Sequence, residues 1–476
     1  MFFAIRPIAA SGGRTQKLGG RRSAPLTSWF LVPWGRGGTF DIRRECLIRR
    51  QRVVKLALAA GMVGLLILPA LVYTQVTGGV LNPRKRKSYT SLSAAVADAA
   101  ANDTLLVSGT LTDGNATLSA MPIPDGLKIV AGRGFRGKLQ VSVCPLLTNP
   151  PPGSPSPTRP NRGILDVSGR LGALTIQGLQ FVVPNGCVAV YSTANGNPLT
   201  VRDLSIMRDS AASSIWGVIL WEENAPGGPF TMERNVMGAG TVVGLWIEGD
   251  SATSVTAFVR RNTIRGARRY GIVVTDLPAG SGVIVEGNLV DGGNHPDNVV
   301  GIGLWESNRV TIWRNTVRNF VGTTYPGWGI TISESPNVQV IRNVVANNGV
   351  GVLVDDISYG PGETAATVVI NFNNITSTVT GAIGLSFLPN SSVTVPLDAT
   401  NNWWGAANGP KDDDTDTTDC PEATPPGCTT PPTAEGGGLP IATNPLASQP
   451  NTDCGAGAGL VRTCPFRTAP VSPAGA

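Results

Sequence analysis

Short apolar segments separated by polar or glycine-containing turns fill the chain between residues 174 and 405. Within each segment apolar and mixed residues alternate, which is the period of a strand and not of a helix. Each apolar triplet precedes a second apolar pair and a third strand that begins after a glycine. The triplets are Leu174–Ile176, Leu199–Val201, Phe230–Met232, Val283–Val285, Val310–Ile312, Val338–Val340 and Val368–Ile370.

One asparagine recurs in this repeat, at steps of 27, 26, 27, 28 and 30 residues. A fixed period in this range is typical of a solenoid in which each repeat forms one coil. Because stacked coils lie about 4.8 Å apart, equivalent side chains form columns. We expect the asparagines to stack at an inward bend between the second and third strand of each coil. They are Asn235, Asn262, Asn288, Asn315, Asn343 and Asn373, with Leu179 and Leu204 in the same position of earlier coils.

The strand that opens with glycine carries the candidate chemistry. Residues one and three after the glycine should point inward, and residues two and four outward. Trp221, Trp246 and Trp305 are therefore predicted to point outward, as are Glu248 and Asp355. An exposed indole could bury a large apolar area, so either sugar rings stack on these tryptophans or the preceding loops cover them.

Carboxylates close the same strands. Neighbouring coils would hold them roughly 5 Å apart, near the separation of a retaining glycosidase pair, and alternate coils roughly 10 Å apart. We predict catalytic roles for Glu222, Glu248 and Asp276, with a calcium site or solvated strand ends as alternatives. The full set is Glu222, Glu248, Asp276, Glu306, Glu334 and Asp356.

Two arginines in the loop before Gly271, Arg268 and Arg269, are candidates for the base or charge clamp of a lyase. A second charged column follows the apolar triplets, and alternating signs on neighbouring coils predict cross-strand ion pairs. We interpret this column as structural. It contains Glu233, Arg260 and Glu286, with Arg234, Arg261, Arg314 and Arg342 beside the asparagines.

The N-terminal part differs from the repeats. Residues 1–52 are basic, and residues 53–76 contain an apolar run long enough to span a bilayer. Basic residues before the run predict a cytoplasmic N-terminal side, for either a signal anchor or a cleaved signal peptide. A third reading starts the protein near Val53. All three place the remainder outside the cytoplasm, joined to the membrane segment by a linker over 77–87.

We expect the solenoid domain to cover 88–405. A helical pattern over 91–100, preceded by Ser or Thr as N-cap, could plug its open N-terminal end. Residues 406–476 are rich in Pro, Gly and Asp, which predicts a disulfide-stapled extension that is partly disordered.

Cysteine usage supports an oxidising compartment. Of 7 cysteines, only Cys46 precedes the apolar run, and an even number follows it. Sequence-local pairing would join Cys144 to Cys187, Cys420 to Cys428 and Cys454 to Cys464, one of 15 possible sets. Metal binding by cysteine is the alternative, but the sequence has no CxxC motif.

Composition excludes several classes. With 59 Gly, 37 Pro and 15% charged residues, the chain is unlike a helical bundle or coiled coil. Much of the net charge of +6 lies before residue 88, so we do not predict nucleic-acid binding. His295 is the only histidine, which excludes a His-rich copper or zinc site.

Several of these segments resemble the right-handed parallel β-helix repeat proteins, both the NosD-like maturation factors and the pectate-lyase-like superfamily. They are Val310–Val317 with Gly329–Ile332, the terminal Asp398–Gly405, and Asn102–Thr104. The resemblance implies an all-β, single-stranded right-handed parallel β-helix. It names no reaction, because this fold hosts lyases, hydrolases, epimerases, adhesins and maturation proteins. The motifs of pectate lyases, polygalacturonases and alginate epimerases are not recognisable.

We therefore expect a monomeric, extracytoplasmic surface protein, membrane-anchored or secreted, that binds or processes polysaccharide on its tryptophan and carboxylate face. No cofactor is required in this reading, and calcium is an option. If it is an enzyme, the resemblance implies a polysaccharide lyase or glycoside hydrolase. The alternative is a non-catalytic structural or partner-binding envelope protein.

Overall fold

The computed structural model describes residues 78–132, 137–147, 160–193, 196–221, 227–250, 254–355, 367–388, 397–407, 410–412, 439–443, 461–462, 466–472 and 474–475. The expected cytoplasmic segment 1–52 and membrane segment 53–76 lie outside these residues. So do Glu222, Asp356 and the cysteines other than Cys144 and Cys187. Among the described residues, no helix is long and apolar enough to span a membrane.

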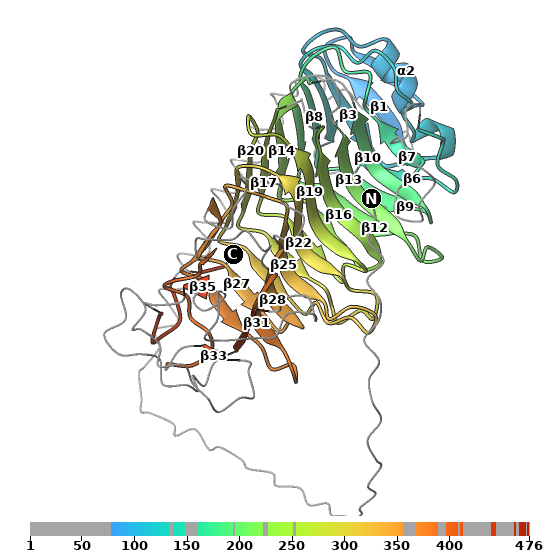
Figure 1. Cartoon of the computed structure of the whole chain (residues 1–476). Helices are drawn as coiled ribbons and strands as arrows, with labels where there is room; N and C mark the ends of the chain where they lie inside the picture. The colour runs from blue at the N-terminus through green and yellow to red at the C-terminus, as the bar shows by residue number, and fades with distance from the viewer. Residues whose placement is uncertain are drawn as a thin grey trace, which may run out of the picture. The chain divides into compact units, whose positions relative to one another are not determined.

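Successive coils contribute one strand to each of three sheets, so the predicted all-β parallel solenoid is confirmed (Figure 1). Sheet A runs through the apolar triplets. In spatial order its described strands are β2 (Lys87–Tyr89), β1 (Gly79–Asn82), β3 (Thr104–Ser108), β5 (Leu127–Ala131), β8 (Leu174–Gln177), β11 (Leu199–Arg202), β14 (Gly227–Glu233), β17 (Val255–Arg260), β20 (Gly282–Glu286), β23 (Val310–Trp313), β26 (Gln339–Ile341), β29 (Val369–Asn371), β32 (Leu397–Asp398) and β35 (Val461–Arg462).

Sheet B holds the short strands that follow the asparagines. Its described strands are β4 (Thr110–Thr112), β6 (Lys138–Gln140), β9 (Gln180–Val183), β12 (Ser205–Arg208), β15 (Val236–Met237), β18 (Thr263–Arg265), β21 (Leu289–Asp291), β24 (Thr316–Arg318), β27 (Val344–Ala346) and β30 (Asn374–Thr376).

Sheet C contains the strands that open with glycine. Its described strands are β7 (Arg162–Asp166), β10 (Cys187–Thr193), β13 (Ile215–Trp221), β16 (Thr241–Glu248), β19 (Tyr270–Leu277), β22 (Val300–Ser307), β25 (Trp328–Ser333), β28 (Val350–Asp355), β31 (Ile383–Leu388), β34 (Pro440–Thr443) and β33 (Lys411–Asp412).

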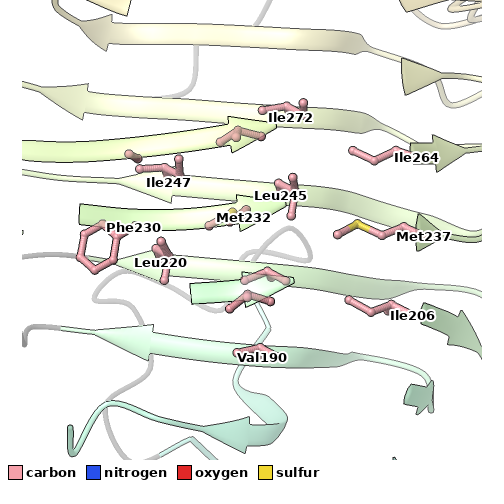
Figure 2. Packing of buried hydrophobic residues seen from close by; sticks show 14 of the residues in the cluster. Val190, Ile206, Leu220, Phe230, Met232, Met237, Leu245, Ile247, Ile264 and Ile272 are labelled. Atoms are coloured by element: carbon pink, nitrogen blue, oxygen red, sulfur yellow. The ribbon is translucent and has the colours of Figure 1, made fainter. Parts of the chain in front are cut away.

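The core fills the space between the three sheets. Met232 from sheet A, Ile264 from sheet B, and Leu245 and Ile272 from sheet C meet there and are at most 1% exposed (Figure 2). Parallel pairing repeats this arrangement in every coil; for example, Val283 pairs with Val310 and Val285 with Ile312. Burial of these branched side chains provides the main driving force for stacking.

The asparagines form the predicted ladder. The Oδ1 of Asn288 accepts the backbone N–H of Asn262 at 2.8 Å and its Nδ2 at 2.9 Å, and Asn288 bonds to Asn315 in the same way. Each Nδ2 also donates to a backbone carbonyl, as Asn288 does to Val259 at 2.9 Å. The ladder continues past the predicted members to Asn402, which accepts from Asn373.

The position of this bend differs from our expectation. Asn262 lies between β17 of sheet A and β18 of sheet B, which are the first and second strands of a coil, not the second and third. The backbone N–H of Leu204 donates to the side chain of Asn235 at 3.1 Å. The coil with leucine at the ladder position is therefore bonded to the first asparagine through its backbone alone.

A short helix, α2 (Leu92–Ala97), lies within the predicted range 91–100 but ends earlier. Ser91 is its N-cap and accepts the N–H of Ala94, and Leu92, Ala95 and Val96 are buried in the main core. Its role in closing the solenoid stays a prediction. The expected linker contains β1, which pairs antiparallel with β2 and β3. A 3₁₀ turn, η1 (Asp113–Asn115), follows β4.

Parts of the expected tail add strands to the solenoid. β34 pairs with β31 of sheet C, and β35 pairs with β32 of sheet A. Val471 exchanges hydrogen bonds of 2.7 and 3.0 Å with the side chain of Asn374. The predicted disulfide between Cys144 and Cys187 is confirmed, and it joins the loop before β7 to β10.

Leucine at a ladder position should cost more inside the ladder than at its end. In Asn288→Leu, the N–H and Nδ2 of Asn262 lose their acceptor, and we expect a loss of about 2–4 kcal/mol in the free energy of unfolding. The matched variant Asn235→Leu leaves fewer donors without an acceptor. The preceding coil has Leu204 at this position, and only its backbone N–H donates to Asn235. Urea midpoints of both variants test this, and equal midpoints would contradict it.

The N-terminal hairpin should respond to acid through Asp98. Hydrogen bonds from Tyr89 and then Lys87 lower the pKa of Asp98 from 3.8 to about 2. A depressed pKa means that the ionised carboxyl stabilises the fold above pH about 4, and that this contribution is lost as pH falls toward 2. Tyr89→Phe should raise the Asp98 pKa, as measured by NMR titration. An unchanged value would show that Tyr89 does not set it.

Candidate functional site

The outer face of sheet C carries the predicted side chains in the predicted direction. Val218 and Leu220 of β13 point into the core, whereas Ile219 and Trp221 do not belong to it. Strand register aligns the outward residues of neighbouring coils: Ile219 pairs with Trp246, and Trp246 with Val273. The alternation deduced from the glycines is therefore confirmed.

A second apolar cluster lies on this face, separate from the main core, and we name it the outer cluster. Sequence reasoning missed most of its members, although several directly precede the glycine that opens a strand. Its buried members are Leu147, Val188, Tyr191, Trp216, Ile219, Val242, Val243 and Val273, and the half-buried Trp246, Tyr270 and Trp305 pack against them.

The three predicted indoles differ in exposure. Trp221 is only 4% exposed, which fits the covering alternative for that residue. Trp246 and Trp305 are half-buried. The Trp305 ring lies across Gly303 of its own strand, because a Cβ on that glycine would overlap the indole. The edge of Tyr270 meets the same ring, with centroids 6.0 Å apart and planes at 84°. Trp305 thus lies along the sheet surface.

The carboxylates do not form the single column that we expected. Glu248 is in register with Trp221 and Thr275, so it belongs to the tryptophan column and is 5% exposed. Asp276 lies one position later, at the turn. Glu248 and Asp276, which we expected at equivalent positions of adjacent coils, are therefore not equivalent. Counting from the glycines would have shown this, since Glu248 is four residues after Gly244 and Asp276 five after Gly271.

Asp276, Glu306 and Glu334 do share one turn position, with left-handed φ of 58°, 47° and 48°. Burial raises the pKa of Glu306, and the nearby charges of Asp276 and Glu334 raise it further. The hydroxyl of Thr275 donates to Asp276 at 2.6 Å. In the described part of the chain, no group of three or more His, Cys, Asp or Glu is arranged to hold a metal. Calcium binding therefore stays a prediction.

The two arginines before Gly271 contact different parts of the structure. Arg268 donates through Nε to Asp297 at 2.8 Å and through a terminal nitrogen to Ser214 Oγ at 2.9 Å, so it links three coils. Its guanidinium lowers the pKa of Asp297. Arg269 instead lies over the ring of Tyr270, 5.6 Å from the centroid, at the border of the outer cluster.

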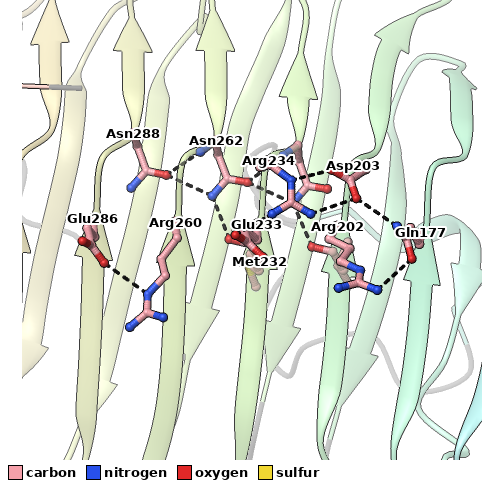
Figure 3. Close-up of polar contacts among 12 residues, drawn as sticks. Gln177, Arg202, Asp203, Met232, Glu233, Arg234, Arg260, Asn262, Glu286 and Asn288 are labelled. Atoms are coloured by element: carbon pink, nitrogen blue, oxygen red, sulfur yellow. Dashed lines mark hydrogen bonds and ion pairs between the residues drawn. The ribbon is translucent and has the colours of Figure 1, made fainter.

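The second charged column lies on sheet A and at the turn after it, and it forms one of the predicted cross-strand ion pairs, between Arg260 and Glu286 (Figure 3). Arg260 Nε is 3.3 Å from Glu286, and Arg234 contacts Asp203 at 2.7 Å and Glu233 at 2.6 Å. The hydrogen bond from Arg234 is the main reason that the pKa of Asp203 is lowered. These contacts support a structural role for this part of the column.

The family comparison agrees with the observed fold. The family model described as "Right handed beta helix region" matches residues 216–394. No curated protein matches the sequence. Among solved structures, the Dettilon tailspike protein is similar at 13% identity and TM-score 0.33, covering 64% of this chain and 62% of its own. The periplasmic alginate epimerase AlgG is similar at 13% identity and TM-score 0.26, covering 61% and 83% respectively.

The bacteriophage CBA120 tailspike protein 3 is also similar, at 14% identity and TM-score 0.18, over 62% of this chain and 57% of its own. The match over 216–394 covers strands of all three sheets, from β13 to β31. Through this region, the chain matches the right-handed β-helix family model, and its three parallel sheets agree with that description.

Proposed function

We propose that this protein binds polysaccharide on the outer face of sheet C, at a platform formed by Trp246, Tyr270 and Trp305. The observation that carries the proposal is the Trp305 ring, which lies along the sheet over Gly303 and stays half-buried. A flat, partly exposed indole beside a second aromatic ring suits the apolar face of a sugar, because it offers a large rigid area at little conformational cost.

Two polar atoms on the same face lack a partner among the described residues. They are the Nε1 of Trp216 and the Oγ1 of Thr331, both in side chains that are 4% exposed. Thr331 pairs across the sheet with Gly303, the residue under the Trp305 ring. Buried polar groups are normally satisfied, so a ligand hydroxyl or a bound water is a natural partner for these atoms.

The carboxylates on the same face give the proposal a second part, in which the bound polysaccharide is also cleaved. The formation of a cleavage product would establish this catalytic role. Glu248 lies in the tryptophan column and Asp276 one position beyond it, and Glu222 directly follows Trp221 in the sequence. Burial and the charges of Asp276 and Glu334 raise the pKa of Glu306, which is the direction that favours a general acid. Arg269 borders the platform and could neutralise an acidic sugar or intermediate.

The cellular place of this activity is extracytoplasmic. The disulfide between Cys144 and Cys187 supports an oxidising compartment. We retain residues 53–76 as the segment that anchors the protein to a membrane or directs its export, because their apolar run follows a basic stretch.

A panel of polysaccharides tested by calorimetry should identify a ligand whose affinity depends on the platform. Trp305→Ala and Trp246→Ala should each weaken binding by about 1 kcal/mol, or roughly fivefold. Gly303→Ala keeps the indole but displaces it, so it should also weaken binding. The matched control is Trp403→Ala, which removes a half-buried indole that pairs with Asn374 of sheet B and should leave the affinity unchanged.

The same panel decides between binding and catalysis. New reducing or unsaturated ends that disappear in Glu248→Gln or Asp276→Asn would identify an enzyme. Binding without product would identify a binding protein. If no polysaccharide binds, or if the variants bind as the parent does, the platform has no such role. The alternative of a structural or partner-binding envelope protein would then hold.

A further inference from the structure

The turn before each ladder asparagine adopts the left-handed conformation in successive coils. From Asp203 to Arg342, the residue there donates its backbone N–H to the carbonyl just before the equivalent residue of the next coil, as Arg261 does to Glu286 at 2.9 Å and Arg314 to Ile341 at 3.2 Å. The position is filled by Asp203, Arg234, Arg261, Gly287, Arg314, Arg342, Phe372 and Asn401, with φ between 53° and 63°.

Four arginines at this position are costly for the fold. Glycine adopts a left-handed φ freely, and a residue with a Cβ costs roughly 1–2 kcal/mol there. The chain itself uses Gly287 and Asn401 at two of these turns. Arg314 and Arg342 also lie on adjacent coils, about 4.8 Å apart, where like charges repel. Stability therefore does not explain the choice of arginine.

Ion pairing explains only one of the four. Arg234 is bonded to Asp203 and Glu233, and the neighbouring Glu286 is engaged by Arg260. Within the described ranges, Arg261, Arg314 and Arg342 form no ion pair. Arg261 and Arg342 are exposed, and Arg314 is half-buried.

Two of these arginines, Arg314 and Arg261, have side chains that lie against neighbouring residues. The guanidinium of Arg314 stacks over the Trp313 indole at 4.5 Å, and its Nε is buried without a partner. The stem of Arg261 passes the empty position at Gly287, where an added Cβ would lie 3.6 Å from Arg261 Cγ. The stem of Arg261 thus lies beside the Gly287 turn, and the backbone positions of the three arginines span three coil steps, or roughly 14 Å.

We propose that Arg261, Arg314 and Arg342, the arginine row, bind a linear polymer of oxyanions that runs along the axis of the solenoid. Guanidinium groups bind phosphate and carboxylate in a two-pronged geometry that lysine cannot reproduce, which accounts for arginine and not lysine at these turns. A membrane surface suits the row less well. The apolar side chains of Phe258, Ile284 and Trp313, on the strands of sheet A that lead to this bend, are half-buried and not fully exposed.

The row lies at the bend between sheets A and B, whereas the proposed polysaccharide platform lies on sheet C. The two proposals are independent, and Trp305→Ala should not affect binding to the row. Either site can fail without the other.

Binding of inorganic polyphosphate and of poly-glutamate, measured against neutral dextran at low and high salt, tests the proposal. The double variant Arg261→Gly with Arg342→Gly should weaken binding roughly fivefold for each lost charge and flatten its salt dependence. Because glycine relieves the left-handed strain, this variant should unfold at the same urea concentration as the parent or higher. Loss of binding could then not be attributed to misfolding.

The structure offers a matched control and a gain of function. Arg86→Gly removes an exposed arginine with φ 53° from the N-terminal hairpin, and it should leave binding unchanged. Gly287→Arg fills the gap in the row and should tighten binding about fivefold. Binding of polyphosphate alone would assign the row to phosphate polymers, and binding of poly-glutamate alone to carboxylate polymers. If neither polymer binds, or if the double variant binds as Arg86→Gly does, the proposal is wrong.

Discussion

The structure depends on how backbone N–H groups are paired at the bend after each strand of sheet A. Backbone N–H groups at that bend are buried in the solenoid, where an unpaired donor is expensive. A ladder asparagine supplies one acceptor to two donors of the preceding coil, and its own Nδ2 donates to a main-chain carbonyl. Each coil is thereby locked to the next at one repeated point, and the parallel register follows.

Because the strands of neighbouring coils pair in register, the sequence repeat places equivalent residues on the same face of the solenoid. Once coils are aligned at the asparagines, side chains that point outward fall into columns with their equivalents. The outer face of sheet C then gathers aromatic residues, among them Trp246, Tyr270 and Trp305. The turn next to the ladder gathers arginines. These two surfaces lie on different parts of the same coils, so the fold can present two separate chemistries without changing its core.

Glycine and left-handed turns shape both surfaces. On sheet C, Gly303 leaves room for the Trp305 indole to lie along the strand. Beside the ladder, the left-handed turn would accept glycine most cheaply, yet Arg261, Arg314 and Arg342 occupy it. In the first case a missing side chain makes space for a ring. In the second case, arginines occupy a strained backbone position although their charges do not stabilise the fold. This is the basis for inferring a ligand.

The sequence by itself determined the solenoid, its period, the asparagine ladder and the inward or outward direction of residues after each glycine, because these follow from local alternation repeated at a fixed step. It also indicated the pairing of Cys144 with Cys187. Only the tertiary structure decided how far each outward side chain is covered. Trp221 is nearly buried and Trp305 is not, since burial depends on contacts between distant segments.

Glu248 and Asp276 both close strands but do not share a column, and their distances from Gly244 and Gly271 already show this in the sequence. The ion pairs of the arginines, in contrast, were decided in three dimensions, because they depend on which acid the neighbouring coil brings near. Local pattern therefore fixed the scaffold of this protein. The packing of one coil on the next decided which side chains remain available for binding.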